Sequence, residues 1–324
     1  MRASSDEDVV PLPAASIRAR SRPWAVIGVW AWESALSLLG AMPAVALVRA
    51  TYGRHPQGDA PLWDPGSLPL LGLLSREANG VRAATTSAAF VLLLASVVGL
   101  VPMAALMVSI STAARDGRSI GGPRAVEGAL RALPPLALLL AAVWLAQGVV
   151  VTVALLLGAG TQSWANRSMG DALAQQMAIG LGAVILIAAV ALGLVHDLAR
   201  AAVVRFGVGT MSALTAGTRA LWRAPISLTW SWIWRALASV VPIVAVSLLA
   251  DCIGGRGGIA LVVLAALHQS VILSRAALRA SWLAKAMRTV EDVSRVGYGE
   301  ADGSDPSEPD RPTGAGRYFE ASDR

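Results

Sequence analysis

The stretch LPPLALLLAAVWLAQGVVVTVALLLGAG, at 133–160, decides the fold class of this chain. It holds no charged residue, and a bilayer core about 30 Å thick takes about 20 helical residues to cross. Similar apolar stretches occupy 177–198, 226–249 and 258–273. Each is near or above the length of a transmembrane helix, so the sequence predicts a multi-pass membrane protein.

Two further segments bring the expected number of spans to six. Residues 24–48 are interrupted only by Glu33 and Pro43, and residues 83–111 are apolar and rich in small side chains. The composition agrees, since 15% of the residues are charged, against about 25% in a typical soluble domain. The predicted fold class is an all-α polytopic membrane helical bundle of six transmembrane helices, arranged as three hairpins.

The two ends of the chain differ from its middle in composition. Residues 1–22 mix acidic and basic groups, and residues 291–324 carry nine acidic against four basic residues. Few large apolar side chains occur in the last part of the tail, so it cannot bury enough surface to offset the entropy lost on ordering. We therefore expect a disordered N-terminal segment over 1–22, a six-helix transmembrane domain over 23–290 and a disordered acidic tail over 291–324.

Arginines are concentrated in alternate loops. The N-terminal segment, the loop at 112–132 and the loop at 199–225 carry four each, whereas the third and fifth loops carry only Arg167 and Arg256. Basic residues accumulate in loops that face the cytoplasm, so we expect both termini to be cytoplasmic. The loop at 49–82 disagrees, because it carries four arginines on the outer side.

The balance of basic residues also indicates the kind of cell. One lysine against 26 arginines, with abundant alanine and glycine, suggests a bacterial source with a GC-rich genome. We therefore expect the protein in the bacterial cytoplasmic (inner) membrane. The net charge of +6 does not indicate nucleic-acid binding, because the basic residues lie beside the spans and form no aromatic-interleaved surface.

No enzymatic motif has the context that its chemistry needs. Residues 117–121 spell G-x-S-x-G, but a nucleophile elbow needs a strand before the serine and a helix after it. Lys285 is the only lysine, so there is no phosphate-binding P-loop. The single cysteine, Cys252, excludes an intramolecular disulfide and a cysteine metal cage. We expect no enzyme activity, no cofactor and no metal.

Two segments of the chain resemble each other. WAWESALSLL at 30–39 aligns without gaps with WIWRALASVV at 232–241, and the same offset places Pro23 on Pro225. Placing Trp144 in the tryptophan column brings Gln147 onto Glu33 and Arg235. We interpret this as an internal parallel repeat of three hairpins; the alternative is chance similarity among helices rich in Ala, Leu and Trp.

The candidate site residues are polar groups inside the spans. Glu33 and Arg235 each lie ten residues past the proline that starts their segment, about 15 Å at about 1.5 Å per residue, which is near the midplane. A lone charge there is unfavourable by roughly 2.5–3.5 kcal/mol, so we predict that the two form an ion pair. The alternatives are that each faces water in a cavity, or that Glu33 is protonated.

Gln147 and His268 complete this set of intramembrane polar residues. His268, Arg275 and Arg279 are spaced by seven and four, so they share one helix face. The simpler interpretation is that the arginines extend to the cytoplasmic interface while His268 hydrogen-bonds a neighbouring helix. The alternative is a polar path that lines the bundle.

The middle of the chain resembles a group of bacterial membrane proteins. Its paired spans, the Arg219-Ala220-Leu221 element and the basic exit helix SRAALRASWLAKAMR at 274–288 are similar to the membrane domain attached to some glycerophosphodiesterases. The resemblance covers 23–290 and rests on general features, and no phosphodiesterase domain is present. It implies a membrane-domain fold and transfers no catalytic residue.

Two classes of function remain open. The first is a non-catalytic membrane module that scaffolds, anchors or regulates partners, with the lipid bilayer around it and the acidic tail as the contact for a protein. The second is a permease or channel-like subunit that uses Glu33, Gln147, Arg235 and His268, since ionisable groups inside a membrane are often functional. A polar, water-filled cavity would favour transport, and a dry, packed bundle would favour the module.

Overall fold

The computed structural model describes residues 9–54, 72, 75–168, 171–253 and 258–301. It is an all-α helical bundle, and six of its helical segments are long and apolar enough to cross a membrane. The helices are α1 (Pro23–Tyr52), α3 (Ala78–Val98), α4 (Leu100–Ser111), α5 (Gly122–Ser168), α6 (Asp171–Phe206), α7 (Thr210–Arg223), α8 (Pro225–Ile253) and α9 (Ile259–Ala301). The six spans confirm the prediction of a multi-pass membrane protein.

Prolines mark where several helices begin or break. Pro23 and Pro225 are the first residues of α1 and α8. Proline is tolerated there because the first N–H groups of a helix have no hydrogen-bond partner within it. The second span divides into α3 and α4 at Gly99. Pro102 follows three residues later and cannot donate to the Val98 carbonyl, which accounts for the break.

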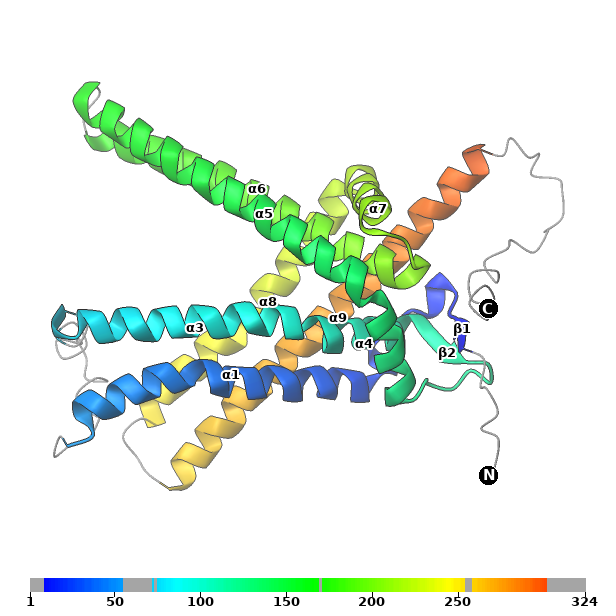
Figure 1. Ribbon diagram of the computed structural model, residues 1–324, viewed down its shortest axis with the longest axis horizontal. Helices are drawn as coiled ribbons and strands as arrows, with labels where there is room; N and C mark the ends of the chain where they lie inside the picture. Colours follow the sequence, from blue (N-terminus) through cyan, green and yellow to red (C-terminus); the bar gives the residue numbers. More distant parts are fainter. Residues whose placement is uncertain (1–8, 55–71, 73–74, 169–170, 254–257, 302–324) are drawn as a thin grey trace.

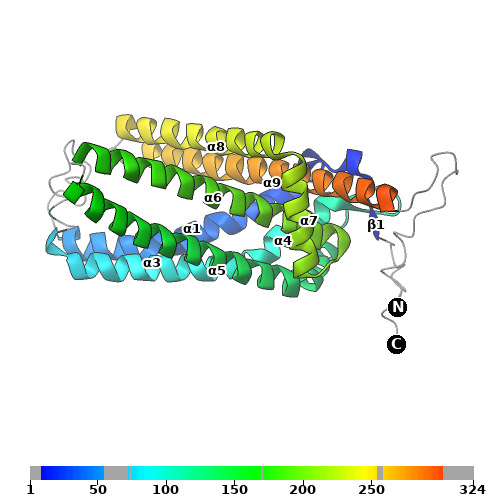
Figure 2. The same cartoon turned by 90° about the horizontal axis from the view of Figure 1, so that it is seen from above.

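The helices form three hairpins that share one end (Figure 1). α1 packs against α3, α5 against α6, and α8 against α9. The α5–α6 pair diverges from the other helices toward the loop ends, whereas all elements converge near α4, α7 and the second half of α9 (Figures 1 and 2). We call this convergent end the base.

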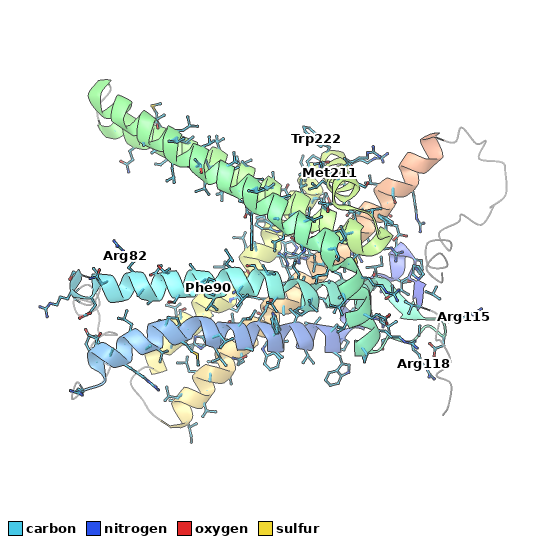
Figure 3. All side chains as sticks on the ribbon, viewed as in Figure 1. Arg82, Phe90, Arg115, Arg118, Met211 and Trp222 are labelled. Carbon is cyan, nitrogen blue, oxygen red and sulfur yellow. The ribbon has the colours of Figure 1, made fainter. Side chains whose placement is uncertain are left out.

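The hydrophobic core lies in the base. Its fully buried large side chains come from the N-terminal segment, α4, α5, α6, α8 and α9, and include Ile17, Met107, Leu136, Leu198, Leu228 and Met287. Away from the base most large apolar side chains point outward (Figure 3). No more than 22% of the most apolar stretch of any span is buried inside the protein, so most of this surface is available to lipid.

The N-terminal segment is folded from Val9 onward, which corrects the expectation of disorder over 1–22. Val9–Pro11 forms a short strand, β1, that pairs antiparallel with β2, Thr112–Ala114. Two 3₁₀ turns follow, and between them Ile17 is fully buried. Leu12 and Ile17 supply the apolar contacts, and backbone carbonyls of this segment accept hydrogen bonds from distant arginines. Residues 1–8 lie outside the described residues.

The expected boundary at residue 290 is also wrong, because α9 continues to Ala301. Glu291 and Val293 are buried, although Asp292 is exposed. The first turn of the supposed tail therefore belongs to the folded base. The expectation of disorder for the remainder falls on residues 302–324, which lie outside the described residues.

Helix α7 was not expected from the sequence, where 199–225 was interpreted as a loop. It crosses the base beside α6 (Figure 2) and buries the small residues Ala213, Gly217 and Ala220. A side chain at Gly217 would meet backbone atoms of α6, since a Cβ built there lies 2.9 Å from the Val195 oxygen and 3.0 Å from the Ala199 nitrogen. The missing side chain is what allows α7 to lie this close.

Replacing Gly217 with alanine is expected to lower the stability of the base. The added methyl group must push α7 away from the backbone of α6, at about 1–3 kcal/mol for an overpacked contact. The matched control is Gly182→Ala, which lies within α6 and where a Cβ meets nothing within 4 Å. Thermal unfolding of the two variants in detergent would contradict this packing if both midpoints moved equally.

Candidate functional site

The buried charges of the described residues gather in the base, between α6 and α9. Asp197 on α6 is 3% exposed, so its carboxylate depends on protein partners. Arg279 Nη2 on α9 donates to its Oδ1 at 2.7 Å, and Trp282 Nε1 donates to its Oδ2 at 2.8 Å. Both oxygens are therefore occupied by one neighbouring helix, and the contact fixes α6 against α9.

Arg200, one turn below Asp197, is a buried cation with little compensation. It is 7% exposed, its Nη1 lies 4.0 Å from Asp197 Oδ1, and its Nε has no hydrogen-bond partner among the described residues. The Nε2 atom of the adjacent His196 is also buried without a partner in that part of the chain. The cluster thus holds two guanidinium groups around one carboxylate.

A second ionic cluster lies closer to the chain termini. Arg205 of α6 pairs with Glu291 of α9, with Nη2 and Oε2 2.9 Å apart and both side chains more than nine-tenths buried. Arg295, one turn beyond Glu291 on α9, binds the other carboxylate oxygen, with its Nη2 2.8 Å from Oε1. Arg205 also donates to the Ser111 carbonyl at 2.9 Å and to the Leu12 carbonyl. One arginine therefore joins α4, α6, α9 and the N-terminal segment.

Arginines also satisfy the carbonyl end of α4. The last carbonyls of a helix have no partner inside it and carry a partial negative charge. Arg22 donates to the Ser109 carbonyl at 2.7 Å and to the Thr112 carbonyl at 3.2 Å, beside the contact of Arg205 with Ser111. Burial lowers the pKa of the Arg22 guanidinium. Arg288 binds the Ile17 carbonyl at 3.0 Å in the same way, so cations hold the N-terminal segment at both ends.

The ion pair expected between Glu33 and Arg235 is not among the ion pairs of the described residues. Arg235 binds Ser231 on its own helix and Ser281 Oγ on α9, at 3.2 Å from Nη2. The charges that act on Glu33 belong to Arg275 and Arg279.

The two residues stay apart because their helices are shifted relative to each other. Ser34, next to Glu33, lies beside Gln269 of α9, and Arg235 lies beside Ser281. Those positions are twelve residues apart on α9, or about 18 Å at about 1.5 Å per residue. Two residues at the same count from equivalent helix starts therefore need not meet.

The other two polar candidates do not join these groups. Gln147 is exposed on α5. His268 is exposed on α9, and its Nδ1 lies 2.8 Å from the Leu264 carbonyl of its own helix. The expected hydrogen bond to a neighbouring helix is made by Gln269 instead, whose side-chain oxygen accepts from Ser34 at 2.8 Å and whose backbone carbonyl accepts from Trp30 at 3.2 Å.

Sequence reasoning did not identify Asp197, Arg205 and Glu291 as important. Asp197 lies near the end of an apolar stretch and Glu291 in the expected acidic tail, and charged residues in such places are usually solvated. A usable signal existed in Ala201, Ala202, Ala280, Ala284 and Ala286, whose small size lets two helices approach closely around a charge.

Comparison with known protein families, curated proteins and solved structures found no match. The resemblance to membrane domains attached to glycerophosphodiesterases therefore stays a prediction. No group of three or more His, Cys, Asp or Glu side chains that could hold a metal ion occurs in the described part of the chain. What the arrangement can do chemically is hold four segments together through charges shielded from water.

Proposed function

We propose that this multi-pass membrane protein is a non-catalytic membrane module that scaffolds or anchors other membrane components. The observation that supports it is the contrast between its two ends. The base is tied together by buried ionic contacts. Toward the loop ends the α5–α6 pair diverges from the other helices (Figure 1), and the spans expose most of their apolar side chains.

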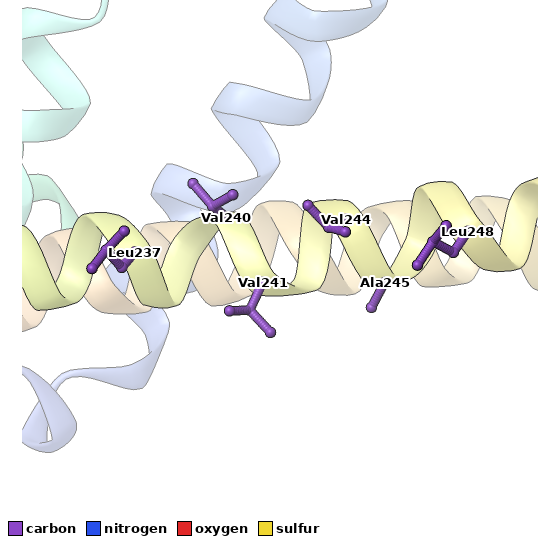
Figure 4. Close-up of a pocket in the computed structure, with 6 residues that line it drawn as sticks. All are labelled: Leu237, Val240, Val241, Val244, Ala245 and Leu248. Atoms are coloured by element: carbon purple, nitrogen blue, oxygen red, sulfur yellow. The ribbon is translucent and has the colours of Figure 1, made fainter.

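Such a molecule presents stable helical surfaces inside the bilayer. On α8, for example, an open apolar hollow is lined by residues of that helix alone, so no other described element fills it (Figure 4). Its lining residues are Leu237, Val240, Val241, Val244, Ala245 and Leu248. Association between helices in a membrane relies on close packing and polar contacts more than on a hydrophobic driving force. A partner helix of complementary shape could therefore replace lipid on this surface.

The test compares the protein in its host membrane with the protein alone. Extraction into polymer-bounded lipid discs, followed by native mass spectrometry, should show a second polypeptide at fixed stoichiometry, and Val241→Trp should release it. The matched control is Leu155→Trp, an equally apolar and exposed position on α5. Discs that hold this chain alone would contradict the scaffold.

A permease or channel-like subunit is the second candidate. It is favoured by a line of charged groups that starts at Glu33 on α1, continues through Arg275 and Arg279 on α9, and ends at Asp197 on α6. Ionisable groups in membrane helices often mark ion pathways. Purified protein in vesicles should then conduct ions in a bilayer recording, and Glu33→Gln should reduce the current. A silent bilayer would remove this candidate.

We propose that the base faces the cytoplasm of a bacterial cell, with both termini on that side of the inner membrane. The arginine-rich loops support this orientation, because arginines favour the cytoplasmic face. Reporter fusions at Gly160 and Asp251 should give a periplasmic signal, and a fusion at Ser304 a cytoplasmic one. Reversed signals would place the base outside. We also propose that the acidic residues of 302–324 contact a protein partner, so deleting them should release that partner without unfolding the bundle.

A further inference from the structure

The contact between α8 and α9 brings three cations near one another, Arg235, Lys285 and Arg288. Arg235 lies beside Ser281 of α9, and Lys285 Nζ lies 3.4 Å from the Ser227 carbonyl of α8. Residues 281, 285 and 288 are spaced by four and three, so Ser281, Lys285 and Arg288 share one face of α9. Residues 227, 231 and 235 share one face of α8 for the same reason. We call this contact the α8–α9 seam.

The cations of the seam have no carboxylate partner among the described residues. Arg235 donates to hydroxyl and carbonyl oxygens of Ser231 and Ser281, and Arg288 donates to the Ile17 carbonyl. The positive charge of Arg288 acts on both Arg235 and Lys285, and that of Arg235 acts on Lys285 as well. Asp292, one turn beyond Arg288, is exposed and forms no ion pair with it. The three cations thus repel one another.

Three other arginines of the base are paired with acids. Arg205, Arg279 and Arg295 each reach a carboxylate within 3 Å. Where the chain brings arginines together elsewhere, it also supplies Asp197 or Glu291. In the seam the described chain supplies only hydroxyl and carbonyl oxygens, so an anion from outside would offset the repulsion of like charges in this partly buried site.

The seam also lies at the depth of lipid headgroups. From Arg235 to the outer end of α8 at Ile253 there are 18 residues, or about 27 Å at about 1.5 Å per residue, close to the 30 Å of a bilayer core. Arg235 is therefore near the boundary of the membrane at the base, not at the midplane. Trp230 and Trp234 are exposed here, as expected for a membrane interface.

The residues around Arg235 separate a polar zone from an apolar one. The Arg235 guanidinium lies over the ring of Trp234, 5.5 Å from its centroid. Beyond this pair the apolar hollow of α8 begins at Leu237 and runs toward the outer end (Figure 4). Phosphate next to the cations and acyl chains against α8 would match this division.

We propose that the α8–α9 seam binds the phosphate group of an anionic phospholipid, with Arg235, Lys285 and Arg288 as its ligands. Ser231 and Ser281 would donate hydroxyl hydrogen bonds to the same group. Basic pockets between membrane helices at this level are suited to lipid headgroups. The inference does not depend on the scaffold function, because it rests only on the unpaired charges and their depth.

The experiment measures lipid binding to the full-length protein by native mass spectrometry. Phosphatidylglycerol and phosphatidylcholine are added separately to the delipidated protein, and inorganic phosphate forms a third arm. We expect phosphatidylglycerol to bind in preference to phosphatidylcholine. In the triple variant R235Q/K285Q/R288Q its affinity should fall about 100-fold, since each cation near an anionic headgroup contributes about a factor of five.

Two further variants keep the test decisive. Arg219→Gln with Arg223→Gln removes exposed arginines of α7 from the same end of the molecule, and should leave phosphatidylglycerol binding unchanged. Lys285→Gln alone removes one weakly bonded cation, so the protein stays folded and its affinity should fall about fivefold. Equal binding of both lipids, or an unchanged affinity in the folded Lys285→Gln protein, would overturn the proposal. Competition by millimolar phosphate as effective as the lipid would assign the site to free phosphate and overturn it as well.

Discussion

The asparagine variant of Asp197 is expected to lose about 3–5 kcal/mol of stability, the range for breaking a buried ion pair by removing one partner. Its carboxylate accepts from both Arg279 and Trp282, and Arg200 lies 4.0 Å away. Asparagine has nearly the same shape, so the change removes the charge and one acceptor while leaving the packing in place. Two guanidinium groups would then lie near each other without the carboxylate between them.

The matched control for this change is Asp116→Asn. Asp116 pairs with Arg118 at 3.1 Å in a surface loop, where the two side chains are 46% and 86% exposed. Exposed pairs contribute about 0–1 kcal/mol, so the unfolding midpoint should barely move. Both variants are measured by thermal unfolding in one detergent. An equal fall of the two unfolding midpoints would show that the buried ion pair contributes no more to stability than the exposed one.

Replacing Arg205 with alanine is expected to release the N-terminal segment as well as destabilise the base. The change leaves Glu291 with Arg295 alone and removes the donor for the Ser111 and Leu12 carbonyls. We expect a loss of about 3–5 kcal/mol for the broken buried pair. Hydrogen exchange of residues 9–17 should become faster than in the wild-type protein.

Arg131→Ala provides the comparison for Arg205, because Arg131 pairs with Glu127 on the exposed side of α5. It should change neither the unfolding midpoint nor the exchange of residues 9–17. Arg205→Lys retains the charge but not the planar group that reaches several oxygens at once. The stability of this variant should therefore lie between that of Arg205→Ala and that of Arg131→Ala. Normal exchange in Arg205→Ala would mean that β1 and Ile17 hold the segment without the arginine.

The sequence was sufficient for the spans because membrane thickness sets their length directly. It was not sufficient for α7, since a helix that buries Ala213, Gly217 and Ala220 shows no long apolar stretch. The local sequence likewise does not show that residues 9–22 are folded. Their polar contacts are made with Arg205 and Arg288, at 193 and 271 residues from the carbonyls that they bind, and nothing in the local composition indicates such contacts.

The expected ion pair illustrates a further limit. Counting from Pro23 and Pro225 gave Glu33 and Arg235 the same depth, but an equal count does not place two side chains against each other. Their contacts on α9 differ by about 18 Å along that helix. The sequence shows which charged residues lie inside apolar spans. Which of them form contacts depends on how the helices are shifted along one another.

The way the N-terminal segment is held has a consequence for biosynthesis. The ribosome makes residues 9–22 before the six spans, yet their contacts come from β2, α6 and α9, the last of which is made some 270 residues later. During translation β1 can pair with β2 once the second span has been made, whereas the contacts with Arg205 and Arg288 wait for α6 and α9. Docking of the segment is therefore completed only after α9, the helix of the last span, has been made.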